Sequence, residues 1–164
     1  MRARRGPTTK SSSDGRSDVT DMNIERAIVI NAPIAVVWRT ITEPDQIARW
    51  FADRVEIDVR PGGAGALFFE KNNLTAPLVV EEVDPPTSFS FRWCQPDGER
   101  PVHGNSTLVA FALVAETDTR TRLTVTETGL DAMPLPDDEK RRFGESHSDG
   151  WKGCFERLGA LFGG

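Results

Sequence analysis

The sequence has few residues of the kinds that build covalent or metal-linked sites. It contains two cysteines, Cys94 and Cys154, and two histidines, His103 and His147, among 164 residues. This cysteine count does not suggest a secreted disulfide scaffold. No Cys-x-x-Cys or His-x-x-x-His spacing occurs that could supply a tetrahedral zinc site. We therefore expect neither a disulfide framework nor a bound metal.

Long apolar runs and the common nucleotide signatures are also missing. No stretch approaches the roughly 20 apolar residues that a membrane-spanning helix needs, and the net charge of −5 argues against broad binding of nucleic acids or anionic membranes. The glycines at 62–65 do not fit the dinucleotide fingerprint, and a Walker-type lysine motif and a Gly-x-Ser-x-Gly elbow are absent. We expect no cofactor, no nucleic-acid partner and no membrane span.

The N-terminal segment is polar. Residues 1–21 are rich in Arg, Ser, Thr, Asp and Gly, and besides Met1 they hold one large apolar residue, Val19. Such a segment cannot bury enough surface to offset the entropy of ordering it, and it lacks the hydrophobic core of a signal peptide. We predict a disordered tail over residues 1–22, one folded domain over residues 23–164, and a cytoplasmic location. Whether the tail contacts an acidic partner or is only a leader stays open.

Residues 24–51 predict a strand followed by two short helices. An apolar strand, Ile24 to Ile30, runs into Pro33, which suits the first turn of a helix. Pro44 ends that helix near Thr42 and suits the start of the next. Two sets of apolar residues recur at helical spacing: Ile34, Val37, Trp38 and Ile41, then Ile47, Trp50 and Phe51.

From residue 54 the apolar period changes to two, which is typical of half-buried strands. Turn residues at 60–63 and at Gln95–Gly98 separate the predicted strands. We predict about six or seven mostly antiparallel strands, one over 55–59 and the others over 65–70, 77–83, 88–93, 106–115 and 121–128, together with the strand at 24–30.

The last element is a long helix from Asp137 with a single apolar stripe. Four glycines weaken this helix, so packing must hold it. A helix with one apolar stripe must lie on a sheet, which makes the chain an α+β domain with a curved antiparallel sheet around the helix. The stripe contains Phe143, His147, Trp151, Cys154, Phe155, Leu158, Leu161 and Phe162.

The stretch IERAIVINAPIAVVWRTITEPDQIARWF over residues 24–51 resembles the opening of the START-like (SRPBCC, helix-grip) superfamily. Within it, AP…VWR.IT.P..IARWF resembles the branch named after the activator of heat-shock-protein ATPase. Further matching segments are RPGG at 60–63, FSFRW at 89–93, TRLTVTETGL at 121–130 and GW at 150–151. The resemblance covers residues 23–164. It implies the helix-grip fold and a cavity, often occupied by apolar ligands, between the concave sheet face and the long helix.

Two polar residues fall on otherwise apolar faces near this expected cavity. Glu127 shares strand parity with Leu123 and Val125, so we expect its side chain to point toward the cavity, with His147 as its partner. The pair could act as a general acid and base, or Glu127 could lie at a water-filled mouth. The aromatic residues could line a pocket or simply fill the core. The candidate ligand-binding residues are Trp50, Phe51, Phe89, Phe91, Trp93, Glu127, His147, Trp151 and Phe155.

The leading functional hypothesis is the binding of a small hydrophobic ligand in a cavity between the sheet and the C-terminal helix. One alternative is a protein-interaction module of the chaperone-ATPase-activator type, as the resemblance implies. Another is an enzyme that acts on a lipid-like or aromatic substrate in the cavity, although no residue is assigned a catalytic role. A homodimer or a protein partner is also left open.

Overall fold

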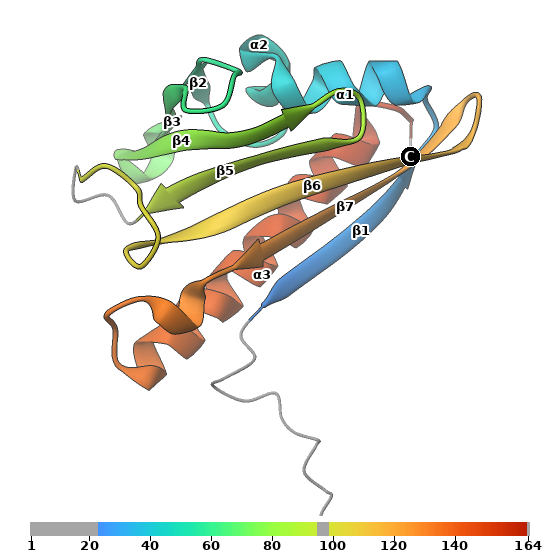
Figure 1. Ribbon diagram of the computed structural model, residues 1–164. Coiled ribbons are helices and arrows are strands. Elements are labelled where there is room, and N and C mark those ends of the chain that lie inside the picture. The colour runs from blue at the N-terminus through green and yellow to red at the C-terminus, as the bar shows by residue number, and fades with distance from the viewer. Residues whose placement is uncertain (1–22, 95–98, 164) are drawn as a thin grey trace, which may run out of the picture.

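The computed structural model describes residues 23–94 and 99–163 of the chain. The tail predicted over residues 1–22 and the turn predicted at Gln95–Gly98 lie outside the described residues. A curved sheet lies against one long helix, and two short helices stand at one end of the sheet (Figure 1). The elements in chain order are β1 (Ile24–Ile30), α1 (Ile34–Thr42), α2 (Pro44–Ile47), β2 (Arg54–Ile57), β3 (Ala64–Phe69), β4 (Leu74–Asp84), β5 (Ser88–Cys94), β6 (Ser106–Thr117), β7 (Arg120–Thr128) and α3 (Asp137–Ala160).

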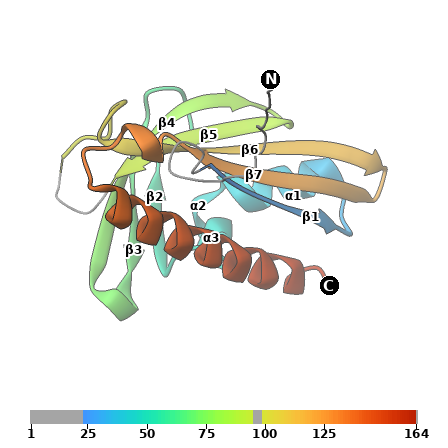
Figure 2. The ribbon, with the colours of Figure 1, turned by 90° about the horizontal axis from the view of Figure 1, so that it is seen from below.

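The seven strands form one sheet in the order β1-β7-β6-β5-β4-β3-β2. Every neighbouring pair is antiparallel. From β2 to β7 each strand pairs with its neighbour in sequence, whereas β1 pairs with β7 and so brings the first and the last strand of the chain together. Seen from below, α3 runs along one face of this sheet (Figure 2). The predicted α+β helix-grip architecture is confirmed.

The first two helices follow the proline signals, with one correction. The first, α1, begins after Pro33 and ends at Thr42, as predicted. The second, α2, begins at Pro44 but ends at Ile47, so the helix predicted to continue through Trp50 and Phe51 is wrong. The N–H groups of Trp50 and Phe51 both bond to the Ile47 carbonyl, in a turn. This turn places both rings in the core, where they are 2% and 9% exposed.

Strand β4 begins earlier than its sequence suggests. The strand predicted to start at Pro77 starts at Leu74, because its pairing with β3 extends to Phe69↔Leu74, whereas the pairing with β5 stops at Leu78↔Trp93. Before Leu78, β4 pairs with β3 alone, so a proline without an N–H removes no ladder bond to β5. Strand β2, predicted over residues 55–59, instead ends earlier than expected, at Ile57, and does not include Val59.

Helix α3 packs most closely against β1, at one edge of the sheet. Gly159 explains the close approach, because a Cβ atom there would lie 3.1 Å from Cδ1 of Ile28. Glycine lowers the helix propensity at this position, but its lack of a side chain lets α3 pack closely on β1. Toward β3, β4 and β5 the gap between helix and sheet is wider and is lined by aromatic side chains. Among residues 23–94 and 99–163, no helix combines the length and apolar composition that a bilayer span requires.

Candidate functional site

A pocket of about 350 Å³ lies in this wider gap, between α3 and the strands β3, β4 and β5. Its wall is mainly apolar, and the exposed residues Asn72, Ser146 and Gly150 mark its mouth. The residues that line it are Phe51, Phe69, Asn72, Leu74, Ala76, Trp93, Ser146, His147, Gly150, Trp151, Cys154 and Arg157.

One face of α3 forms the helical wall of the pocket. Its lining residues follow the helical repeat from Ser146 to Arg157. Gly150 lies in the middle of this face, and a Cβ atom there would meet no heavy atom within 4 Å. The missing side chain therefore leaves the pocket open at this point.

The sheet wall comes from the end of β3 and the start of β4. Phe69 and Leu74 are paired across the two strands, and a short 3-10 turn at Glu70–Asn72 joins them. Asn73 closes that turn in the left-handed region, with φ of 52°, a conformation that asparagine tolerates better than most residues. This tight connection holds both side chains at the pocket wall.

Behind the pocket, the carboxylate of Glu127 is 1% exposed and accepts hydrogen bonds from β5, β6 and α3. Trp93 Nε1 and Thr107 Oγ1 donate to Oε2 at 3.0 and 2.5 Å. Trp151 Nε1 donates to Oε1 at 2.8 Å. His147 Nδ1 lies 2.9 Å from Oε2 and 3.0 Å from Oε1. One buried carboxylate therefore ties three strands to the helix.

These donors decide the charge state of Glu127. Burial alone would raise its pKa, because water no longer solvates the carboxylate. The hydrogen bond and the charge of His147, together with the bonds from Thr107 and Trp151, outweigh burial and hold the pKa below its ordinary value of 4.5. At neutral pH the pocket is therefore backed by an ionised carboxylate.

The imidazole of His147 is fixed in its orientation. It stacks on Phe143 with ring centroids 4.0 Å apart, and its ring contacts Trp93 edge-on at 5.4 Å. Its side chain is 23% exposed and lines the pocket. Because Nδ1 faces the Glu127 carboxylate, Nδ1 carries the hydrogen. Nε2 has no hydrogen-bonding partner among the described residues and is available to a ligand.

A thiol and a guanidinium complete the helical wall. Arg157 donates from Nε to the Trp50 carbonyl at 3.1 Å and from Nη2 to Cys154 Sγ at 3.4 Å. Burial raises the pKa of Cys154 to about 11, although the nearby Arg157 charge and hydrogen bond oppose the shift. The free thiol is therefore protonated at neutral pH and is a poor nucleophile.

The structure brings some of the nine predicted site residues to the pocket and leaves others in the core. Four of them line it: Phe51, Trp93, His147 and Trp151. Glu127 lies directly behind three of these four and contacts them through hydrogen bonds. The remaining four are buried core residues away from this wall: Trp50, Phe89, Phe91 and Phe155. A ligand-binding role for any of the nine stays a prediction.

Sequence patterns missed several lining residues. Phe69, Leu74 and Ala76 enter the pocket because β3 and β4 pair in the register that they do. Arg157 is charged and was not part of the apolar stripe, yet it follows Trp151 and Cys154 at three-residue steps on the same helix. That spacing was the available signal for its place at the pocket.

Comparisons with known proteins agree with this architecture. Residues 31–163 match the family described as "Activator of Hsp90 ATPase homolog 1-like protein". No curated protein matches the sequence. Among solved structures, protein MLL2253 from Mesorhizobium loti is 23% identical, with a TM-score of 0.70 over 85% of this chain and 95% of that one.

Two other solved structures have a similar fold. The Aha1 dimer from Colwellia psychrerythraea is 17% identical, with a TM-score of 0.68 over 85% of this chain and 95% of that one. PFC0360w, an HSP90 activator from Plasmodium falciparum, is 17% identical, with a TM-score of 0.67 over 87% of this chain and 96% of that one. At these identities the likeness shows the fold.

Proposed function

Because the chain belongs to the family of activator of Hsp90 ATPase homolog 1-like proteins, and because its sheet and helix enclose an apolar pocket, we propose that it binds a small hydrophobic ligand in that pocket. The observation that carries the proposal is the combination of an aromatic wall with one fixed imidazole whose Nε2 has no hydrogen-bonding partner within residues 23–94 and 99–163. Binding sites for small molecules are typically apolar hollows with a few well-placed polar groups.

The size and chemistry of the pocket support this proposal. Its volume of about 350 Å³ falls within the range of roughly 300–1,000 Å³ that is common for ligand sites. Phe51, Trp93 and Trp151 offer flat surfaces for an aromatic or aliphatic body. His147 Nε2 offers one hydrogen bond to a polar group of the ligand, with Glu127 holding the ring in place. A ligand with a mainly apolar body and few polar groups fits this arrangement.

The neutral, environment-sensitive dye Nile red should bind the folded protein saturably, and Trp93→Ala should weaken that binding about tenfold, equivalent to about 1.4 kcal/mol. Trp93 forms part of the pocket wall and is only partly buried. Fluorescence titration measures the affinity, and native mass spectrometry of protein from its own host tests for a co-purifying molecule. Binding that is unsaturable, or unchanged by Trp93→Ala, would contradict the proposal.

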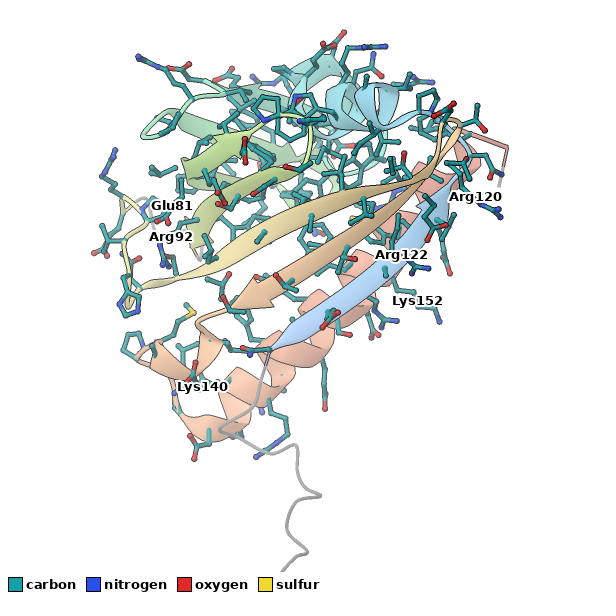
Figure 3. The ribbon with its side chains drawn as sticks, turned by 45° about the vertical axis from the view of Figure 1, so that its right-hand side comes forward. Glu81, Arg92, Arg120, Arg122, Lys140 and Lys152 are labelled. Atoms are coloured by element: carbon teal, nitrogen blue, oxygen red, sulfur yellow. The ribbon has the colours of Figure 1, made fainter. Side chains whose placement is uncertain are left out.

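Gly150→Leu should block the pocket without unfolding the protein. The new side chain would point into the open space at the pocket mouth, and replacing a helix glycine favours the helix by up to about 1 kcal/mol. We expect dye binding to be lost while the melting temperature is unchanged or higher. Lys152→Leu, on the exposed side of the same helix (Figure 3), is the matched control and should bind dye normally.

The alternative function is that of a protein-interaction module. The family match and the similar folds of an Aha1 dimer and an HSP90 activator favour it. An ATPase assay with an Hsp90-type chaperone separates the two functions. Stimulation that persists in the Gly150→Leu variant would favour the interaction module, since that variant has a blocked pocket. Size-exclusion chromatography with light scattering would show whether the chain forms a dimer.

A further inference from the structure

A second hollow of different chemistry adjoins the pocket. This second hollow, of about 380 Å³, adjoins the turn after α2 and the turn between β3 and β4. It shares part of its wall with the first pocket, namely Phe51, Phe69, Asn72 and Arg157. The two hollows are therefore adjacent, and Arg157 lies on the wall that they share.

The charged side chains that line the second hollow are mainly positive, in contrast to the Glu127 carboxylate behind the first pocket. Arg157 is the one side chain of fixed charge on the wall of the apolar pocket. The second hollow is lined by the cations Arg49, Lys71 and Arg157 and by one anion, Asp53, which is three positive charges against one negative and leaves +2. The whole chain has a net charge of −5, so the charge of this site is opposite in sign to that of the protein.

Asp53 is hydrogen-bonded to the backbone, whereas the three cations form no salt bridge with the part of the chain that the structure describes. Oδ2 of Asp53 accepts the backbone N–H of Glu70 at 2.7 Å. None of the salt bridges among the described residues includes Arg49, Lys71 or Arg157. A ligand anion at this hollow would therefore meet three cations, with Asp53 as the one carboxylate on the same described wall.

Two hydrogen bonds also fix the Arg157 side chain in a position that suits contact with an anion. Its bonds to the Trp50 carbonyl and to Cys154 Sγ use the single N–H of Nε and one of the two N–H groups of Nη2. A guanidinium has five N–H donors in a fixed plane, so the others remain for a ligand. Planar carboxylates match this geometry in a two-pronged contact. Because two bonds already fix the side chain, less rotamer entropy is lost when an anion binds.

We propose that the ligand of this protein is an amphipathic acid, with its apolar body between the sheet and α3 and its carboxylate at Arg157, where the apolar pocket meets the second hollow. This inference rests on the proposed ligand-binding function and specifies its ligand class. Arg49 and Lys71 supply further positive potential at the carboxylate end.

Decanoate and decanol test this proposal, because the two probes share an apolar chain and differ in charge. Trp93 and Trp151 line the pocket, so tryptophan fluorescence reports binding of both. We expect decanoate to bind at least about tenfold more tightly than decanol, as a charge-assisted hydrogen-bonded pair would provide. High salt should reduce this preference, since Arg157 is exposed to solvent.

Arg157→Gln should bring the ratio of the two affinities close to one. Arg157→Lys should restore part of the preference, because it keeps the charge but loses the planar fork. Arg120→Gln, which removes an arginine charge at the exposed start of β7 outside both hollows (Figure 3), should leave both affinities unchanged. Circular dichroism melting of each variant confirms that it is folded before affinities are compared.

The outcomes separate the two proposals. If neither probe binds the wild-type protein, the ligand-binding function itself fails. If both probes bind with equal affinity and Arg157→Gln changes nothing, ligand binding stands and the acidic ligand class is overturned. Arg157-dependent co-sedimentation with phosphatidylglycerol vesicles, together with no preference for decanoate, would overturn a free acid in favour of a membrane lipid.

Discussion

Trp151→Ala should lower the free energy of unfolding by about 3–5 kcal/mol, as deletion of a large buried aromatic does. The side chain is 2% exposed, and its ring stacks on Phe51 with centroids 5.0 Å apart. Its indole N–H donates to the buried carboxylate of Glu127. Because the ring also borders the pocket, fewer packed neighbours are lost than in a solid core, and we expect the lower half of this range. Urea unfolding followed by circular dichroism measures the loss.

The milder variant Trp151→Phe separates packing from hydrogen bonding. It retains an aromatic ring but removes the N–H, so the carboxylate loses one donor, which costs about 1–3 kcal/mol for a buried charged group. A loss under about 0.5 kcal/mol for Trp151→Ala, the size typical of surface sites, would show that this face of α3 does not meet the sheet.

Glu127→Gln should destabilise the protein by about 3 kcal/mol or more, because the buried donors around it lose an ionised acceptor and some are left unsatisfied. The carboxylate accepts bonds from Trp93, Thr107, His147 and Trp151. A glutamine carbonyl has room for two of these donors, and its amide group would point N–H bonds at the rest. Chemical unfolding at pH 7 measures the difference from the wild type.

The same carboxylate should make the stability of the wild type depend on pH in the acid range. The pKa of Glu127 is lower in the folded protein than its ordinary value of 4.5. Its contribution is therefore complete above the unfolded-state pKa and is lost as the pH falls through the lower, folded-state pKa. We expect a steep loss of unfolding free energy below about pH 4.5 that is shallower in Glu127→Gln.

A surface carboxylate provides the matched control for both measurements. Glu81 pairs with Arg92 across β4 and β5 at 2.6 Å, and its side chain is 43% exposed (Figure 3). Glu81→Gln should change the stability by less than about 1 kcal/mol. If Glu127→Gln behaved like Glu81→Gln at every pH, the buried carboxylate would not be the group that ties the strands to the helix.

Periodicity in the sequence was sufficient to predict most of the fold. The period of two located the strands, and the proline at residue 44 located the break between α1 and α2. Strand parity also placed Glu127 on the inner face of β7, since it is buried between half-buried neighbours, as Val125 is. These predictions succeeded because they depend on local geometry, which each residue's neighbours in sequence determine.

The pocket wall depends on contacts that local patterns do not contain. Phe69 and Leu74 line it because of a left-handed residue, Asn73, and the pairing of two strands around it. The end of α2 at Ile47 was missed because Trp50 and Phe51 have helical spacing but gain more by turning into the core. Here tertiary burial outweighed helix periodicity.

The pairing of β1 with β7 has a consequence for the order of folding. Strands β2 to β7 pair between sequence neighbours, so each hairpin closes a short loop. The pairing of Ile24 with Glu127 instead joins residues about a hundred positions apart, and such closures are entropically costly and slow. We expect β1 to dock last, together with α3, against a hairpin array that has already formed. Native-state hydrogen exchange should then show β1 and α3 opening as one unit while β5, β6 and β7 remain protected.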